Sequence, residues 1–387
     1  FTGFVGIRDP LRLDVKEAVE TAEKAGVSTK MLTGDNINTA IAIGKELGLL
    51  NGKCRAVEAT YIDTLSDAEL RQEITTISIV ARSKPDTKMR IVQALQSNGE
   101  VVAVTGDGIN DAPALTKADV GIAMGIAGTE VSKNAADIIL TDDSFGTIVK
   151  GIKWGRGIYE NFQRFIQFQI TVNIIAFLTA ILSVVLDFQM PFTTIQLLWV
   201  NIIMDGPPAL SLGLEPVRDA VLNRKPTNRN ASIITKQMLK SMISNALYIT
   251  CVLMAQMKFD ILGTGFPKEG VTGANEMQTV LFALFAFSAL FNAFNCREFG
   301  TDSIFPNLTK NTIFLKIIGA TALAQIVVTE VFSKFFNAVS LSATMWLKII
   351  VVSSLVIVIN EVAKLIMKLF GKKEQEIESE LEEKKAA

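Results

Sequence analysis

Apolar and polar positions are arranged differently in the two parts of the chain. Before about Tyr159, short β-rich apolar runs alternate with stretches of helical periodicity, and after it long apolar runs dominate. The predicted strands are residues 27–32, 77–81, 101–105, 120–124 and 138–140, and the predicted helices are residues 14–25, 36–47 and 87–96. This alternation predicts an α/β domain over residues 1–158, with a parallel sheet between helices and ligands at the carboxyl ends of its strands.

The second part of the chain reads as a membrane domain. Residues 165–186 carry no charged side chain over a length that crosses a hydrocarbon core. Six membrane-spanning helices are predicted within residues 159–370, at about 162–186, 193–214, 239–258, 277–297, 313–333 and 344–368. The predicted fold class is therefore an α/β domain followed by an all-α membrane bundle, with residues 371–387 as a charged tail.

Basic residues in the loops predict the orientation of this bundle. The loops on the side of the α/β domain carry Arg218, Arg224, Lys225, Arg229, Lys236, Arg297 and Lys310, and the opposite loops carry mainly Lys258, Lys268 and Lys334. Because basic residues concentrate on the cytoplasmic side of a membrane, we expect the α/β domain and the tail to be cytosolic. The expected protein is a multi-pass integral membrane protein in contact with lipid.

Composition excludes several function classes. The net charge of −1 lacks the basic excess of a nucleic-acid-binding surface. The absence of histidine removes Ser-His and Cys-His nucleophile pairs. Cys54, Cys251 and Cys296 have no CxxC spacing, which predicts reduced structural thiols. The chain starts at Phe1 without a signal-peptide pattern, so we expect a piece of a longer protein.

Two predicted strands end in the same tripeptide, at residues 33–35 and 105–107 (Thr-Gly-Asp). Hydroxyls, backbone amides and carboxylates at one sheet edge suit phosphate and Mg²⁺. After the second turn, Asp107 and Asp111 can approach one site, and Gly108 permits close approach of the backbone. Carboxylate oxygens are the ligands that a hard divalent cation prefers.

These polar residues have an alternative interpretation as helix caps. Asn36 suits the start of the helix that follows the first turn, and Pro113 suits the first turn of a helix after Asp111. The repetition of the tripeptide favours a phosphate site, as do Lys84 and Lys88 near the end of an intervening strand.

The stretch TGDGINDAPALTKADVGIAMG at residues 105–125 resembles the hinge signature of P-type ATPases, within the haloacid-dehalogenase-like superfamily. IRDPLR at residues 7–12, MLTGDN at 31–36 and ARSKPDTK at 81–88 occur in the order of that family. The resemblance covers essentially the whole chain. It implies a Rossmann-like phosphorylation domain, Mg²⁺ and ATP as cofactors, and an aspartyl-phosphate mechanism.

The positions that match the family's phosphorylation motifs are Thr33, Gly34, Asp35, Lys88, Asp107, Asn110 and Asp111. By the resemblance, Asp107 would hold Mg²⁺ with support from Asp111, and Asn110 and Asp111 would position the phosphoryl group. Thr33 and Lys88 would contact its oxygens, while Gly34 and Asp35 would support the site and the nucleotide. The family's nucleophile is an Asp in a DKTG stretch, which this sequence lacks. The isolated chain is therefore expected to be inactive and to lack most of the ATP-binding domain.

A carboxylate within the membrane domain indicates a cation site. An Asp in a span costs roughly 3 kcal/mol, so Asp205 should face the protein interior. Asn201 and Asp205 are spaced to share a helix face, and the Gly-Pro-Pro at residues 206–208 should break the helix and free carbonyl oxygens. Alternatively the prolines kink a packed helix and Asp205 pairs with a basic residue, although no Arg or Lys lies between Arg164 and Arg218.

Residues 196–216 are similar to the sixth span of calcium pumps, and residues 167–176 to the fifth, closest to the plasma-membrane type. This resemblance implies Asn173, Asn201 and Asp205 as ligands of the transported Ca²⁺. Pumps of the reticulum type, which carry two ions, have Glu, Thr and Glu at the positions that align with Ala176, Met204 and Ala289. Because these oxygens are missing, we expect one Ca²⁺ per cycle from a monomeric pump.

Three alternatives stay open at this point. The Gly-Pro-Pro at residues 206–208 differs from the Thr-containing version common in plasma-membrane calcium pumps, which leaves Mn²⁺, H⁺ or Na⁺/K⁺ as the transported ion. The absent DKTG stretch fits a non-catalytic truncated membrane protein. A phosphatase domain tethered by an anchor would need one span, and six predicted spans argue against it.

Overall fold

A computed structural model describes residues 2, 11–12, 14–52, 54–266 and 274–386, with side chains as far as residue 370. The chain divides into two compact units, Phe1–Arg156 with Val217–Ala231, and Gly157–Pro216 with Ser232–Ala387. The loop 217–231 therefore belongs to the first unit, although it connects predicted membrane spans. Most of the IRDPLR motif lies outside the described residues.

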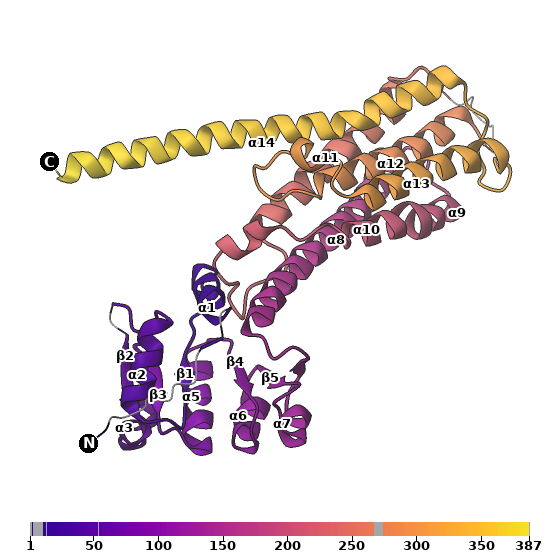
Figure 1. Cartoon of the computed structure of the whole chain (residues 1–387). Helices are drawn as coiled ribbons and strands as arrows, with labels where there is room; N and C mark the ends of the chain where they lie inside the picture. Colours follow the sequence, from indigo (N-terminus) through magenta and orange to yellow (C-terminus); the bar gives the residue numbers. More distant parts are fainter. Residues whose placement is uncertain (1, 3–10, 13, 53, 267–273, 387) are drawn as a thin grey trace. The chain divides into compact units, whose positions relative to one another are not determined.

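The first unit is an α/β fold whose strands are all parallel (Figure 1). Its elements are α1 (Val15–Lys24), β1 (Met31–Leu32), α2 (Ile37–Glu46), β2 (Arg55–Glu58), α3 (Ala59–Thr64), α4 (Asp67–Glu73), β3 (Ile77–Ala81), α5 (Pro85–Ser97), β4 (Ala103–Gly106), η1 (Ile109–Asp111), α6 (Ala112–Lys117), β5 (Val120–Met124), α7 (Glu130–Ala135), β6 (Ile138–Leu140) and η3 (Asp219–Asn223). The predicted α/β class with parallel strands is confirmed.

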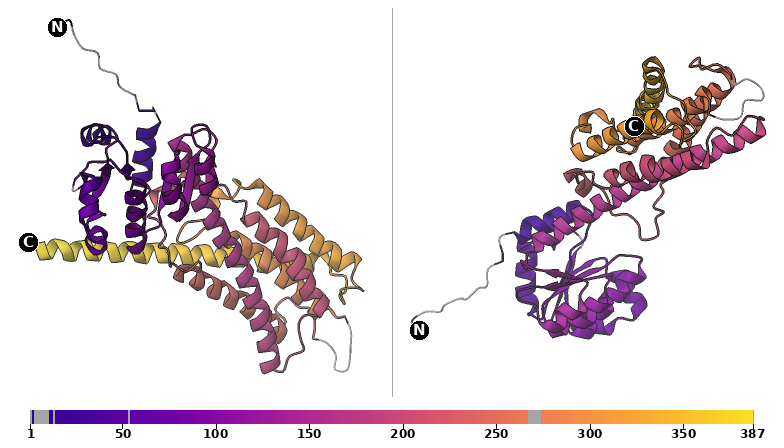
Figure 2. Two further views of the ribbon diagram at one scale, coloured as in Figure 1. Left: turned by 90° about the horizontal axis from the view of Figure 1, so that it is seen from below. Right: turned by 90° about the vertical axis from the view of Figure 1, so that its right-hand side faces the viewer.

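Strand β3 shows why the sequence folds in this way. All five of its residues are buried. Ile77 and Val80 pack in one apolar cluster, with residues of α3, α4 and α5, whereas Ile79 and Ala81 pack in another, with residues of α1 and α2. Helices lie on both sides of the strands of this unit (Figure 2), and a strand covered on both faces needs a largely apolar run. Residues 77–81 provide it, with the small, buried Ser78 as the one polar residue.

The strands form two three-stranded sheets, in the orders β1-β3-β2 and β4-β5-β6, rather than the single sheet that we predicted. Within the described residues, no strand pairs with both β1 and β4. The predicted strand at residues 27–32 shortens to Met31–Leu32 because the Val27 amide donates to the Ala22 carbonyl at 2.9 Å and thereby prolongs the end of α1.

The second unit consists of helices. Helix α8 (Phe145–Val185) begins in the first unit and is followed by α9 (Thr194–Trp199), η2 (Val200–Asp205), α10 (Gly206–Leu212), α11 (Lys236–Phe259), α12 (Glu276–Asn295), η4 (Phe305–Asn307), α13 (Thr312–Val331) and α14 (Ala343–Ala386). Among the described residues, five helices are long and apolar enough to cross a membrane, namely α8, α11, α12, α13 and α14. The predicted span 193–214 is divided into α9, η2 and α10, so none of its helices is long enough alone.

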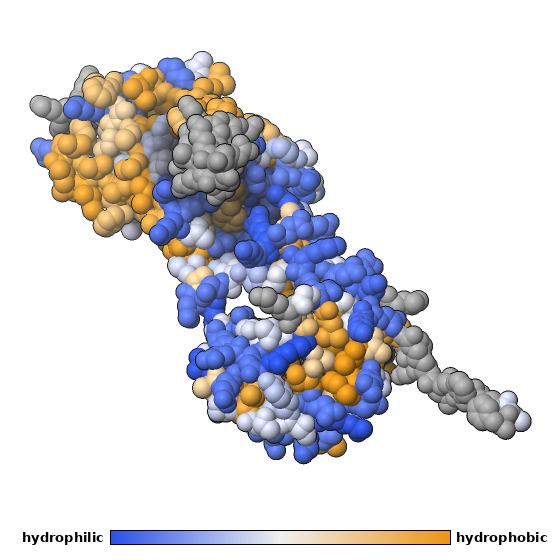
Figure 3. All heavy atoms as spheres, turned by 90° about the vertical axis from the view of Figure 1, so that its left-hand side faces the viewer, coloured by the Kyte–Doolittle hydropathy of each residue, from blue (hydrophilic) through white to orange (hydrophobic). Residues whose placement is uncertain are grey.

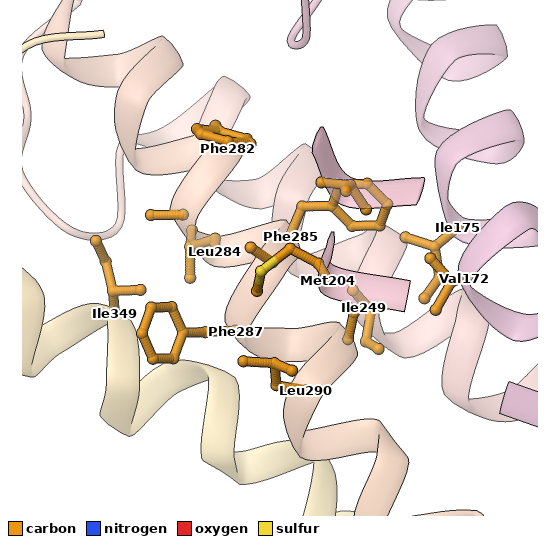
Figure 4. Packing of buried hydrophobic residues seen from close by; sticks show 14 of the residues in the cluster. Val172, Ile175, Met204, Ile249, Phe282, Leu284, Phe285, Phe287, Leu290 and Ile349 are labelled. Carbon is orange, nitrogen blue, oxygen red and sulfur yellow. The ribbon is translucent and has the colours of Figure 1, made fainter. Parts of the chain in front are cut away.

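Helix α12 forms the centre of the second unit. Its most apolar stretch is 83% buried, whereas the corresponding stretches of the other four long helices are 22–39% buried. Phe282, Phe285 and Phe287 of α12 lie among apolar side chains of the neighbouring helices (Figure 4). On the face that Figure 3 shows, apolar residues form a broad patch on this unit, as expected for helices that face lipid.

A buried ion pair and its hydrogen-bond partners connect four segments of this unit. Arg297, after α12, contacts Glu215, after α10, with an Nη2–Oε1 distance of 2.6 Å, and both side chains are 1% exposed. Asn311, before α13, donates to the second Glu215 oxygen at 2.8 Å. Arg164 of α8 donates to the Arg297 carbonyl at 2.9 Å. The pair therefore holds together the ends of several helices.

Candidate functional site

The first candidate site begins at the turn after β1. The Thr33 amide donates to Val80 O at 3.0 Å, and Thr33 O accepts from the Ser83 amide at 2.8 Å, so the turn continues the pairing of β1 with β3. Thr33 Oγ1 donates to Asp35 Oδ2 at 2.9 Å and accepts from the Asp35 amide at 3.1 Å. These bonds fix the turn while Gly34 and Asp35 remain exposed.

The turn after β4 is built around Asp111. Lys88 Nζ of α5 lies 2.6 Å from Asp111 Oδ1, and both side chains are mostly buried. Asp111 Oδ2 accepts from the backbone amides of Gly108 at 3.1 Å and Asp107 at 3.3 Å. Both oxygens of the Asp111 carboxylate therefore have donors. Asp111 connects Lys88 to the turn that contains Asp107, and both of these residues are predicted site residues.

Asp107 is held by its backbone and leaves its side chain exposed. Its carbonyl accepts from the Thr129 amide at 2.8 Å and from Ser132 Oγ at 3.0 Å, at the start of α7. Thr129 also caps α7 by accepting from the Ser132 amide at 3.2 Å. We did not predict Thr129 and Ser132 as site residues, although Thr is a residue type that often precedes the first turn of a helix.

Asp143 is a further acidic residue at the carboxyl edge of the sheet β4-β5-β6. The sequence analysis did not predict it as a site residue. Its carboxylate accepts from the backbone amides of Ile126 at 3.0 Å and Ala127 at 2.8 Å, in the turn after β5. The bond from Ile126 is the main reason why the pKa of Asp143 lies below its ordinary value, with burial acting in the opposite direction. Asp143 thus stabilises the turn as a carboxylate.

The capping interpretation is correct in part. Asn36 Oδ1 accepts from the Thr39 amide at 3.0 Å and so caps α2. Pro113 lies in the first turn of α6, where its missing N–H costs nothing. Neither capping role applies to Asp107, whose exposed carboxylate can bind a cation.

Among the described residues, no three Cys, Asp or Glu side chains converge, so a metal ion bound at Asp107 would take further oxygen ligands from substrate or water.

Gly106 makes the position of Asp111 possible, and this leads to a prediction. A Cβ atom at Gly106 would lie 2.4 Å from Asp111 Cβ, far inside contact distance. We expect Gly106→Ala to displace Asp111 from Lys88 and to lower the free energy of unfolding by about 1–3 kcal/mol. A lower midpoint of thermal unfolding of the full-length protein reports this loss.

Gly108→Ala is the matched control. A Cβ atom there would lie 3.5 Å from Asp111 Oδ2, which is an ordinary contact, and the backbone φ of −99° suits any residue. An equal loss of thermal stability in both variants would contradict the steric explanation.

The second candidate site is Asp205 in the helical unit. The side chain is completely buried, and its Oδ2 accepts from Gln169 Nε2 of α8 at 2.5 Å. Asp205 Oδ1 has no donor among the described residues. The alternative that Asp205 pairs with a basic residue is wrong, because its partner is an amide. Gln169 was not predicted as a site residue, although it lies one helical turn before Asn173.

The span is interrupted directly before the predicted Gly-Pro-Pro. Residues 206–208 form the first turn of a new helix, α10, and their prolines lack the amides that would bond to carbonyls of the preceding turn. The disruption lies in η2, a π-helix over Val200–Asp205. π-helical turns loosen the regular backbone bonding and often occur at functional sites. Asp205 is the last residue of η2.

The two predicted amide ligands differ from Asp205 in exposure. Asn173 and Asn201 are exposed, whereas Asp205 is buried. Asn173 Nδ2 donates to the Gln169 carbonyl of its own helix at 3.0 Å. Within the described residues, the direct side-chain partner of Asp205 is therefore Gln169 rather than Asn173 or Asn201.

Two family models match the chain. The model of the C-terminus of cation transporting ATPases matches residues 189–366, and the model of haloacid dehalogenase-like hydrolases matches residues 2–119. The first match contains Asp205 and α11–α13, and the second contains the turns after β1 and β4.

The chain is also similar to plant proteins. It is 41% identical over 354 residues to calcium-transporting ATPase 9, plasma membrane-type, of Arabidopsis thaliana, covering 90% of this chain and 33% of that protein. It is 42% identical over 369 residues to probable calcium-transporting ATPase 6, plasma membrane-type, of Oryza sativa subsp. japonica, covering 95% and 36%. The chain spans about a third of the length of these relatives. Because five helices among its described residues are long and apolar enough to cross a membrane, it is a multi-pass integral membrane protein.

Proposed function

The chain belongs to the cation-transporting P-type ATPases, and from this premise we propose that it forms part of an ATP-driven pump for calcium. The observation that carries the proposal is Asp205, a buried carboxylate in a broken membrane helix with one oxygen that lacks a donor among the described residues. A carboxylate in this position suits a cation that enters without its water shell. The names of the plant relatives favour Ca²⁺ as this cation.

The first unit supports the phosphoryl-transfer half of this function. Asp107 has an exposed carboxylate suited to Mg²⁺, which would supply charge neutralisation at the phosphoryl group. Asp111 holds the turn behind it through Lys88 and two backbone amides. Lys88 brings a positive charge to the same edge.

The turn after β1 would provide the remaining contacts to the phosphoryl group and the nucleotide. Thr33, with its hydroxyl fixed by Asp35, would contact phosphoryl oxygens, and Gly34 leaves open space beside the backbone. Asn110 is exposed beside Asp107 and would position the phosphoryl group. The phosphorylated Asp and most of the ATP-binding surface would come from the part of the protein outside this sequence.

The transport half would use Asp205 with Asn173 and Asn201. Both amides are exposed on the second unit and are available to segments outside this sequence. Ala176, Met204 and Ala289 lack the side-chain oxygens that pumps carrying two ions have at these positions, which supports one Ca²⁺ per cycle.

The basic residues in the loops support a cytosolic location of the first unit and of the tail. A monomeric pump is the simplest assembly.

Two features of the chain support coupling between these halves. Helix α8 is continuous from Phe145 to Val185 and so passes through the predicted junction near Tyr159. Arg156 of α8 donates to the carbonyls of Ala25 at 2.6 Å and Arg224 at 2.8 Å, which ties the loop 217–231 to the first unit. A displacement of either feature during phosphorylation would reach the membrane helices along the chain itself.

ATP-dependent ion uptake by vesicles that contain the full-length protein tests the proposal. We expect uptake of radioactive Ca²⁺ and a phosphoenzyme whose formation from ATP requires Ca²⁺, with one Ca²⁺ bound per phosphorylation site. Mn²⁺, Na⁺, K⁺ and a pH gradient are examined in parallel. A phosphoenzyme that depends on one of these ions and not on Ca²⁺ would refute the calcium assignment, and no phosphoenzyme with any ion would refute the pump.

A further inference from the structure

The two oxygens of the Asp205 carboxylate have different surroundings. Oδ2 accepts a hydrogen bond from Gln169 Nε2 of α8 at 2.5 Å, whereas Oδ1 has no donor among the described residues. The whole Asp205 side chain is buried. Because buried polar atoms nearly always have a partner, the open Oδ1 is the oxygen suited to contact a cation.

The hydrogen bond from Gln169 fixes which oxygen of Asp205 stays open. A carboxylate that is held at one oxygen cannot exchange its two oxygens by rotation unless that hydrogen bond breaks. Hydrogen bonds to an ionised group are short and about twice as strong as those between neutral groups. Among the described residues, Gln169 is the one side chain that donates to Asp205, so this orientation depends on a single amide.

A glutamine suits this role better than a basic residue would. An amide nitrogen donates a hydrogen bond but carries no charge, so it orients a carboxylate without neutralising it. A Lys or Arg in the same place would form an ion pair with Asp205 and compete with the cation for its charge. Gln169 Nε2 faces the carboxylate and cannot itself bind a cation, because it is only a donor.

Gln169 also contacts a second predicted ligand. Its backbone carbonyl accepts from Asn173 Nδ2, one turn later in α8, at 3.0 Å. Because the nitrogen of the Asn173 amide is engaged in this way, its Oδ1 is the end of the group that suits a cation. Gln169 therefore holds one side chain of α8 and one side chain of η2.

We propose that Gln169 is a positioning residue of the cation site, which holds the Asp205 carboxylate so that Oδ1 faces the transported cation. This inference rests on the proposed function, because Gln169 acts on that cation through Asp205. It goes beyond the ligand set expected from the sequence, which did not include Gln169.

Gln163 provides a matched control on the same helix. Its Nε2 donates at 2.8 Å to the backbone carbonyl of Ile233, and the residue is 8% exposed. Gln163→Met and Gln169→Met therefore make the same chemical change in α8, and each removes a hydrogen bond donated by an amide. Only Gln169→Met removes a donor from a carboxylate.

Equilibrium binding of radioactive Ca²⁺ to the purified full-length protein, without ATP, tests the proposal. We expect Gln169→Met to raise the dissociation constant about 10–100-fold, because a carboxylate that rotates freely must be ordered when the cation binds. Gln169→Leu removes the same donor with a different side-chain shape and should give the same shift. Gln163→Met should stay within about threefold of the wild-type value.

The number of Ca²⁺ ions bound per molecule separates positioning from a general structural role. We expect this number to be unchanged in both Gln169 variants. A structural role would instead lower it at an unchanged dissociation constant, because fewer molecules would be folded. That result, or equal shifts in Gln169→Met and Gln163→Met, would overturn the inference.

The same measurement separates this inference from the proposed function. A wild-type protein that binds no Ca²⁺ refutes the proposed function, and the inference with it. If the wild type binds Ca²⁺ and both Gln169 variants bind it with the wild-type dissociation constant, only the inference fails.

Discussion

Asp205→Asn in the full-length protein is expected to abolish Ca²⁺-dependent phosphorylation by ATP, with a loss of apparent Ca²⁺ affinity of more than about 100-fold. Asn has nearly the same shape as Asp and can still accept a hydrogen bond from Gln169, so the substitution removes the charge alone. Asp205 is fully buried, and charges interact strongly in a low-dielectric interior. Phosphorylation assayed over a range of Ca²⁺ concentrations measures the effect.

Asp187→Asn provides the control for Asp205→Asn. Asp187 is an exposed residue after α8 with a backbone φ of 56°, a conformation that Asn adopts readily. We expect this variant to keep the wild-type Ca²⁺ dependence. Phosphorylation by inorganic phosphate without Ca²⁺ should survive in both variants, because it uses the first unit. Unaltered Ca²⁺ dependence in Asp205→Asn would show that the carboxylate does not bind the cation.

The second large effect is expected from the buried ion pair between Arg297 and Glu215. Glu215→Ala would leave the Arg297 guanidinium buried with backbone carbonyls but without its counter-charge. Removing one partner of such a pair costs about 3–5 kcal/mol, because the remaining charge is uncompensated. We therefore expect a loss of this size in the free energy of unfolding, measured by denaturant unfolding of the full-length protein in detergent.

The double variant and a surface pair test the explanation. Arg297→Met combined with Glu215→Ala removes both charges, so its cost should be smaller than the sum of the single costs by at least about 1 kcal/mol. Asp67, paired with Arg90 by a 2.8 Å contact, is 86% exposed, and Asp67→Ala should cost less than about 1 kcal/mol. Additive costs at Glu215 and Arg297 would mean that the pair contributes no coupling energy.

Part of the candidate site could be predicted because it depends on local sequence. Thr33 and Asp107 each follow an apolar strand, and the carboxyl ends of parallel strands are where ligands collect. Lys88 was predicted for a related reason, since it lies in the first turn of α5, the helix that follows β3. The contact between Lys88 and Asp111 was not predictable, because it depends on how α5 packs beside the turn after β4.

The site at Asp205 could likewise be predicted from the sequence only in part. A carboxylate in a long apolar stretch identifies Asp205 from sequence alone, because an unpaired charge does not face lipid. The π-helical form of residues 200–205 was not predicted, because proline indicates that the regular backbone bonding is lost but not which form the preceding turn takes. The partner of Asp205 is Gln169, and no spacing rule relates residues on two different helices.

The sequence by itself determined the α/β class, the apolar spans, the strand-end motifs and the intramembrane Asp, because periodicity, apolar length and turn residues are properties of neighbouring positions. Only the tertiary structure decided that the strands form two sheets, that the loop 217–231 belongs to the first unit, and that Gln169 is the side-chain partner of Asp205. These features depend on contacts between residues far apart in the chain. Local propensity does not encode such contacts, which form only when the packing of whole helices and sheets brings the residues together.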